Sequence, residues 1–134
     1  MRYFIDTNVI IDLLKNEKKA KDVILPLLND EQSELYINRI VLSESLRTIR
    51  YKDTKKFQYA KSTLELFTQL DITPDIYQES IEFSRFCISK GVTLKGKCAL
   101  MDFLHFITAK HYNLKIVTFD NDFEKLETKY EEFK

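Results

Sequence analysis

A short run of strand-forming residues at the start of the chain stops at an aspartate, and an amphipathic helix begins directly after it. The expected strand covers residues 2–6 and closes on Asp6, and the expected helix covers residues 8–15. Near the other end of the chain, the expected strand 115–119 leads in the same way to Asp120. Core packing requires no acid at either position. Ligands bind beyond the carboxyl ends of parallel strands, so neighbouring strands would bring the two aspartates to one edge of a sheet.

Strands and helices alternate along the chain, which predicts an α/β fold with a mainly parallel sheet. Apolar residues at helical spacing predict helices over residues 20–28, 39–49, 54–69, 75–89 and 99–111, and a short helix from residue 122. The other extended candidates are residues 35–37, a short step at 71–73 and an edge strand at 130–133. Right-handed crossovers then place the carboxyl ends of the parallel strands on the same edge.

Particular residues are expected to set the ends and faces of these helices. Asp6 or Thr7 can cap the first helix, and Asn38 can cap the helix that follows the second strand. The helix 75–89 is expected to end at Gly91. Its inward face is expected to consist of Ile76, Ser80, Ile81, Ser84, Cys87 and Ile88.

The size and composition of the chain suit one domain covering residues 1–134. Hydrophobic residues make up 44% and charged residues 31%, which is typical of a soluble globular domain. No apolar run approaches the roughly 20 residues needed to span a bilayer. Cys87 and Cys98 do not make a disulfide framework, so we expect two reduced thiols in a cytoplasmic protein.

The 21 basic and 21 acidic residues cancel, so a strong general attraction to nucleic acid is not guaranteed. Lysines nonetheless gather in three places: Lys15, Lys18, Lys19 and Lys21; Lys52, Lys55 and Lys56; and Lys90, Lys95 and Lys97. A solvated surface is the simpler interpretation of each cluster. Tyr51 and Tyr59, near the second cluster, are the aromatic residues best placed to be exposed, and aromatic rings can stack on RNA bases.

Five acids fall where an α/β fold could gather them: Asp6, Glu44, Asp102, Asp120 and Asp122. Asp6 and Asp120 follow strands, whereas Glu44 and Asp102 lie early in helices. Each acid alone has a simpler explanation, because acids cap helices, complement the helix dipole by about 0.3–1 kcal/mol or form Asx turns. The joint pattern is what favours a shared site.

Electrostatics limit what such a site would tolerate. Two ionised carboxylates about 6 Å apart repel by roughly 3 kcal/mol at an effective dielectric constant near 20. Four carboxylates make about six pairs and a total near 15 kcal/mol, whereas a domain has only about 5–15 kcal/mol of net stability. Either some acids stay protonated or a divalent cation binds. An all-oxygen site suits Mg²⁺ or Mn²⁺, which can activate water for phosphodiester hydrolysis.

Four segments make the chain resemble PIN-domain ribonucleases, and more closely VapC-type toxins of toxin–antitoxin pairs. The segments are Phe4–Asn8, Leu42–Glu44, Met101–Ala109 and Ile116–Phe123. A single segment is not specific, but all four in this order and in a chain of this length form a strong signal. The resemblance covers essentially the whole chain.

The resemblance implies a three-layer α/β/α sandwich with about five strands and an endoribonuclease that depends on Mg²⁺ or Mn²⁺. Its catalytic acids would be Asp6, Glu44, Asp102 and Asp120. The metal would be held by Asp6, Asp102 and Asp120, with Asp122 as an auxiliary acid. Thr7, Asn8 and Thr118 would orient these carboxylates or bind water. The family also implies a cognate antitoxin and a homodimer, to which residues 39–69 would contribute apolar surface.

Two positions depart from the family pattern. Phe119 stands where such toxins often have a basic residue, and Phe103 stands where they more often have a small one. The acids themselves are intact. Two alternatives remain: a non-catalytic module that binds RNA or protein, and a phosphotransfer or phosphatase domain with Asp6 as nucleophile. The second usually needs an acid two residues later, where this chain has Asn8.

Overall fold

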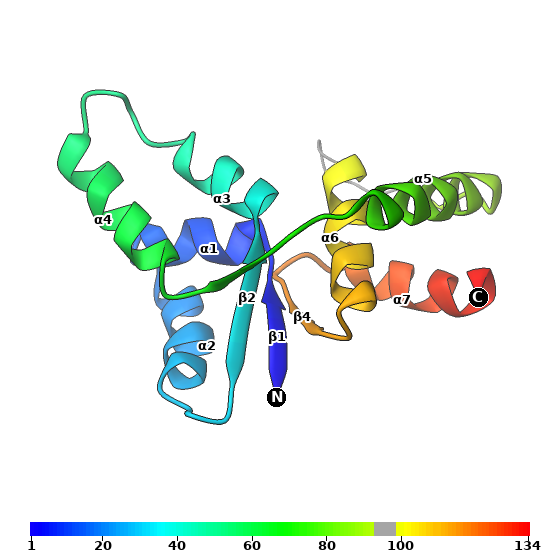
Figure 1. The fold of residues 1–134 in the computed structure, drawn as a ribbon, viewed down its shortest axis with the longest axis horizontal. Coiled ribbons are helices and arrows are strands. Elements are labelled where there is room, and N and C mark those ends of the chain that lie inside the picture. Colours follow the sequence, from blue (N-terminus) through cyan, green and yellow to red (C-terminus); the bar gives the residue numbers. More distant parts are fainter. Residues whose placement is uncertain (93–98) are drawn as a thin grey trace. The chain divides into compact units, whose positions relative to one another are not determined.

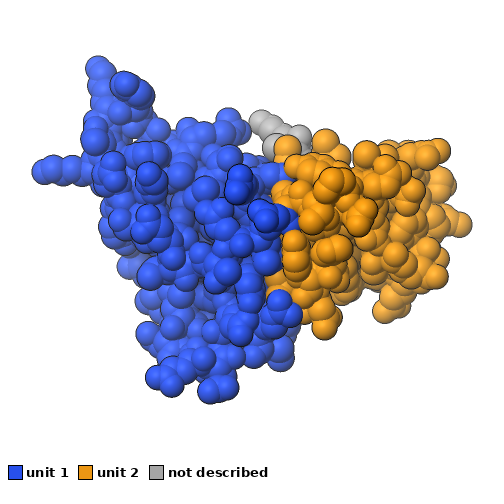
Figure 2. All heavy atoms as spheres, viewed as in Figure 1, with its two compact units in different colours: residues 1–71, 115–119 blue, residues 72–114, 120–134 orange. Residues whose placement is uncertain are grey.

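The computed structural model describes residues 1–92 and 99–134, and its contacts divide the chain into two units. Unit 1 consists of Met1–Asp71 and Lys115–Phe119, and unit 2 consists of Ile72–Leu114 and Asp120–Lys134 (Figure 2). The expectation of one domain over residues 1–134 stays a prediction. No helix among the described residues is long and apolar enough to cross a membrane.

Unit 1 contains a parallel sheet, with β1 at Arg2–Ile5, β2 at Glu34–Asn38, β3 at Thr68–Leu70 and β4 at Lys115–Val117. The strand order in the described residues is β3-β2-β1-β4, and Figure 1 labels β2, β1 and β4. The parallel α/β sheet is thereby confirmed, with four strands instead of about five. Strand β4 lies beside β1 although more than 100 residues separate them, with Phe4 opposite Ile116.

The helices of unit 1 are α1 at Thr7–Leu14, α2 at Lys18–Leu28, α3 at Arg39–Leu46 and α4 at Thr54–Leu64. Both predicted caps are present. The Asp6 side chain accepts a hydrogen bond from the backbone N of Thr7, and the Asn38 side chain accepts one from that of Val41. The unit's core is aliphatic and aromatic, and its fully buried side chains include Phe4, Ile5, Ile10, Ile24, Ile37 and Leu64.

The end of α4 corrects one expectation. The helix predicted over residues 54–69 stops at Leu64, and residues 68–70 form β3 before the extended step predicted at 71–73. The reason for this difference lies in the tertiary structure. Thr68 and Leu70 pair with the edge of β2, and this pairing overrides the local helical pattern.

Unit 2 contains α5 at Pro74–Ser89, α6 at Ala99–His111 and α7 at Asp122–Phe133. Helix α5 ends as expected, because Gly91 has a φ of +73° and the backbone N atoms of Gly91 and Val92 donate to carbonyls of the last turn. Residues 93–98, which include Cys98, lie outside the described residues.

The core of unit 2 is built around Phe83, which the sequence analysis leaves out of the inward face of α5. Its ring centroid lies 5.3–5.7 Å from those of its aromatic neighbours, which are Phe103, Phe106, Tyr130 and Phe133. Ile76, Ser80 and Cys87 are buried with it, as expected. Ile81 and Ile88, expected to face inward, are 51% and 70% exposed. The prediction therefore chose the wrong side of the helix for these two residues.

The edge strand predicted at residues 130–133 is also wrong, because these residues form the last turn of α7. A helical conformation places Tyr130 and Phe133, three residues apart, on one face, and both rings pack on Phe83. The Tyr130 hydroxyl also donates to Glu79 Oε1 at 3.0 Å, and Lys134 forms an ion pair with the same carboxylate.

Candidate active site

Asp6 lies where β1 ends and α1 begins, and the sheet itself sets its position. Its backbone N donates to the carbonyl of Val117 at 2.9 Å, which continues the pairing of β1 with β4. Its side chain is buried, with 4% exposed. Oδ1 accepts from the backbone N of Thr7 at 2.8 Å, and Oδ2 accepts from the hydroxyl of Thr118 at 2.7 Å. A carboxylate has about four acceptor positions, and these two bonds occupy two of them while fixing its orientation.

Asn8 connects the start of α1 to the end of β4. Its amide nitrogen donates to the Thr118 hydroxyl at 3.4 Å, and its amide oxygen accepts from the backbone N of Phe119 at 3.3 Å. Asn8 therefore binds the same hydroxyl that binds Asp6, and the role predicted for Asn8 and Thr118 in orienting carboxylates stays a prediction. Both residues lie where two parallel strands reach the same edge of the sheet.

Glu44, from α3, is linked to this network through Thr7. The Thr7 hydroxyl donates to Glu44 Oε1 at 2.7 Å, while the Thr7 backbone N donates to Asp6. Thr7 therefore contacts two predicted catalytic acids that are 38 positions apart in the sequence. This contact brings Asp6 and Glu44 into one neighbourhood, as the sequence analysis expects for two of its four catalytic acids.

The other three predicted acids belong to unit 2. Asp102 lies in the first turn of α6, as expected. Asp120 lies three residues beyond the end of β4, whereas the sequence analysis places it directly after the strand. Asp120 Oδ1 accepts from the backbone N of Asp122 at 2.9 Å, which is the Asx turn considered as an alternative. Asp122 is buried and forms an ion pair with Lys125 at 3.3 Å.

The carboxylates provide the hard oxygen donors that Mg²⁺ and Mn²⁺ prefer, and in that respect they fit such an ion. Asp6 and Glu44 supply two carboxylates in unit 1. Within its described residues, neither unit by itself gathers three or more His, Cys, Asp or Glu side chains placed to hold a metal. The complete set of four catalytic acids, and the metal set that includes Asp122, therefore stays a prediction.

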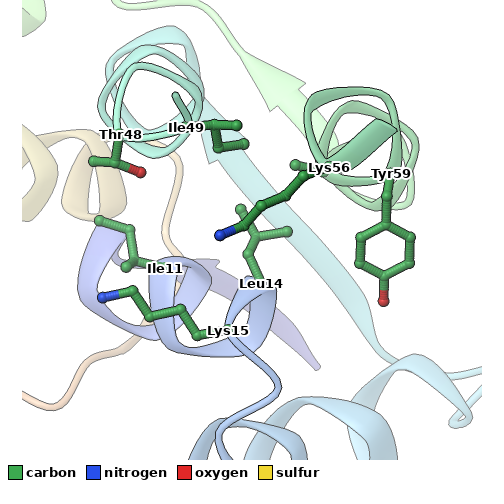
Figure 3. Close-up of a pocket in the computed structure, with 8 residues that line it drawn as sticks. Ile11, Leu14, Lys15, Thr48, Ile49, Lys56 and Tyr59 are labelled. Atoms are coloured by element: carbon green, nitrogen blue, oxygen red, sulfur yellow. The ribbon is translucent and has the colours of Figure 1, made fainter. Parts of the chain in front are cut away.

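A groove in unit 1 was not foreseen from the sequence. Its volume is about 140 Å³, and it opens between α1, the turn after α3 and α4 (Figure 3). Its lining residues are Ile11, Leu14, Lys15, Thr48, Ile49, Lys56, Tyr59 and Ala60. Lys15 and Lys56 extend from different walls, and neither forms an ion pair with a described acid. The sequence signal that could have predicted this groove is the pair of apolar residues Ile11 and Leu14 on a second face of α1.

A family model for the PIN domain matches residues 3–129. The chain belongs to the PIN domain family. Its acidic network at the carboxyl edge of a parallel sheet is therefore part of a PIN fold, and the predicted fold class and family are confirmed. No curated relative matches this sequence.

Solved structures with the same fold include toxin–antitoxin proteins. The structure of VapBC2 from Rickettsia felis, bound to a DNA fragment from its promoter, has a TM-score of 0.78 and 19% identity over 94% of this chain and 93% of that chain. A toxin–antitoxin complex from Klebsiella pneumoniae has a TM-score of 0.67 and 23% identity over 90% and 89%. VapC20 from Mycobacterium tuberculosis, a Sarcin-Ricin loop cleaving toxin, has a TM-score of 0.67 and 14% identity over 92% and 93%. At these identities the likeness establishes the fold.

Proposed function

We propose that this PIN domain is a metal-dependent endoribonuclease that hydrolyses RNA phosphodiester bonds, and that it is the toxin of a type II toxin–antitoxin pair. The observation that carries the proposal is the buried Asp6 carboxylate, which accepts hydrogen bonds from Thr7 and Thr118. The Thr7 hydroxyl also binds Glu44. Core stability does not require this arrangement, because a buried carboxylate is costly unless it is paired or binds a cation. The likeness to VapC structures supports the toxin assignment.

In the proposed enzyme, Asp6, Glu44, Asp102 and Asp120 are the catalytic acids. The metal ligands are Asp6, Asp102 and Asp120, with Asp122 as an auxiliary acid. A bound Mg²⁺ or Mn²⁺ supplies an activated water and neutralises negative charge on the phosphate. Within the chain, Thr118 and the Thr7 backbone hold the Asp6 oxygens in place, and the Thr7 hydroxyl orients the Glu44 carboxylate. In the proposed enzyme, Glu44 accepts a proton as the general base, and its hydrogen bond from Thr7 supports this role.

Cleavage of a labelled RNA by purified protein tests the proposal directly. We expect cleavage with Mg²⁺ or Mn²⁺, none with EDTA, and a loss of at least about 100-fold in Asp6→Asn, which keeps the side-chain shape but removes the charge. Asp12→Asn, a change of the same kind elsewhere in α1, is the matched control and should cleave like the wild type. Equal cleavage in EDTA, or by Asp6→Asn, would contradict the proposal and favour the non-catalytic alternative.

The partner in this proposal is an antitoxin, and the groove of unit 1 suggests where part of it binds. An apolar floor with Lys15 and Lys56 on its walls complements an amphipathic segment with acidic residues along its edges. We expect Lys56→Glu to weaken antitoxin binding at least 10-fold and to leave RNA cleavage unchanged. Lys61→Glu, on the same helix but outside the groove, is the control. Equal antitoxin affinity of both variants would exclude the groove as the antitoxin-binding site.

The proposed toxin acts in the cytoplasm as a homodimer. Tyr59 and Leu66, which are 56% and 62% exposed, provide part of the apolar surface expected from residues 39–69. Sedimentation of the purified chain measures the state directly, and a monomer at all concentrations would refute the dimer.

A further inference from the structure

Residues 47–55, which connect α3 to α4 and include the first two residues of α4, carry positive charge that the rest of the protein does not neutralise. This segment is called the arm below, and it loops outward from unit 1 (Figure 1). It contains four basic residues and one acid, a net charge of +3 in a chain whose total is zero. The charge continues into α4, so that residues 47–64 contain six basic residues and one acid.

The ion pairs show which of these basic side chains are already paired with an acid. Arg50 binds Asp53, with Nε and Oδ2 3.1 Å apart. Arg47, Lys52 and Lys55 form no ion pair with any acid in the described part of the chain. In the first lysine cluster, by contrast, two of the four lysines are engaged, because Lys18 is paired with Asp22 and Lys19 lies over the ring of Phe119. Three like charges in a short exposed segment repel one another, and a polyanion would relieve this repulsion.

Tyr51 stands in the middle of the arm, directly between Arg50 and Lys52, and is fully exposed. Its ring contacts no aromatic or cationic side chain among the described residues. Packing therefore does not explain it. A solvated ring flanked by basic side chains is the combination that binds single-stranded nucleic acid, because every base can stack on the ring while the cations contact phosphates.

We propose that the arm binds single-stranded RNA, with Tyr51 stacking on a base and Arg47, Lys52 and Lys55 contacting phosphates. This inference rests on the proposed function, since it assigns further contacts for the same RNA substrate in addition to the acids. RNA is favoured over an acidic protein segment because the exposed side chains of the arm are basic, aromatic or threonine, and none of them is aliphatic. The apolar floor that an amphipathic segment needs lies in the groove.

The test is an RNA-binding titration in the Asp6→Asn background, which measures affinity without cleavage. The probe is a labelled single-stranded oligoadenylate of about 12 nucleotides, within the size that such surfaces bind. We expect Tyr51→Ala to weaken binding about 5- to 100-fold, which corresponds to the loss of one stacked base. Tyr77→Ala, which removes a partly exposed tyrosine of α5, is the matched control and should bind like the parent.

Charge is tested separately by the salt dependence of binding. The double variant Lys52→Gln with Lys55→Gln should reduce the slope of log K against log salt concentration by about 1.4, or 0.7 for each phosphate contact. The double variant Lys90→Gln with Lys115→Gln removes two exposed lysines elsewhere and should leave the slope unchanged.

The outcomes separate this inference from the proposed function. Unchanged affinity and slope in both arm variants would overturn the inference, even if the wild type cleaves RNA. Weakened binding by the arm variants of a protein that never cleaves RNA would support the inference and refute the nuclease. Loss of antitoxin binding with unchanged RNA affinity would overturn the inference in favour of a protein partner.

Discussion

The two units use hydroxyl groups in different ways, and these groups are partly buried in unit 1 and buried in unit 2. In unit 1, Thr118 donates to Asp6 and Thr7 donates to Glu44, so each hydroxyl links elements that are distant in sequence. In unit 2, Ser80 and Thr108 donate to carbonyls four residues earlier in their own helices. Aromatic rings around Phe83 hold the helices of unit 2 together instead. The comparison teaches that long-range polar links set the geometry of the candidate site, whereas apolar packing supplies stability.

The largest expected effect is the loss of the ring at the centre of unit 2. Phe83→Ala should lower the free energy of unfolding by about 3–5 kcal/mol, because it leaves a cavity among four other rings. Ile81→Ala, on the exposed side of the same helix, should change it by less than about 0.5 kcal/mol. Urea denaturation measures both. Similar losses in the two variants would show that the assignment of the buried side of α5 is wrong.

A smaller effect is expected where a hydroxyl supports the site. Thr118→Val leaves one oxygen of the buried Asp6 carboxylate without this donor, which should cost about 1–3 kcal/mol of stability and lower RNA cleavage about 10- to 100-fold. Thr118→Ser should restore both properties because it keeps the hydroxyl.

The matched control for this prediction is Thr108→Val in unit 2. Its hydroxyl donates to a helix carbonyl, which keeps its backbone partner, so the change should be nearly neutral in stability and in cleavage. Denaturation and cleavage assays on all three variants test the comparison. An equal loss of stability and of cleavage in Thr108→Val and Thr118→Val would show that the two units do not differ in how they use their hydroxyl groups.

The smallest expected effect concerns the stability of unit 2 in alkali. Burial, together with the hydrogen bond to Glu79, raises the pKa of Tyr130 above its usual value near 10. The folded state therefore retains the phenol proton better than the unfolded state, and the resulting stability is lost as the pH rises above about 10. Denaturation between pH 9 and 11 should show a shallower decline in Tyr130→Phe than in the wild type. Parallel declines would contradict this role for Tyr130.

Much of the fold could be predicted because its signals are local. The strand that leads to the Asp6 cap, the cap at Asn38 and the turn at Gly91 each depend on a few adjacent residues, and all three are confirmed. The buried side of α5 could not be predicted in the same way. Apolar residues occur around most of that helix, and only its neighbours select Phe83 for the interior over Ile81.

The features of the candidate site also separate into those set by local sequence and those set by tertiary structure. The sequence by itself determined which acids are present, the ends of the elements that carry them and the family to which the chain belongs. Tertiary structure alone decided that Thr118 binds Asp6, that Thr7 contacts Glu44 and that a groove forms beside α1. It also turned residues 68–70 into a strand and residues 130–133 into a helix. The physical reason is that caps and turns are satisfied within a few residues, whereas strand pairing, ring packing and side-chain hydrogen bonds between distant segments exist only after the chain has folded.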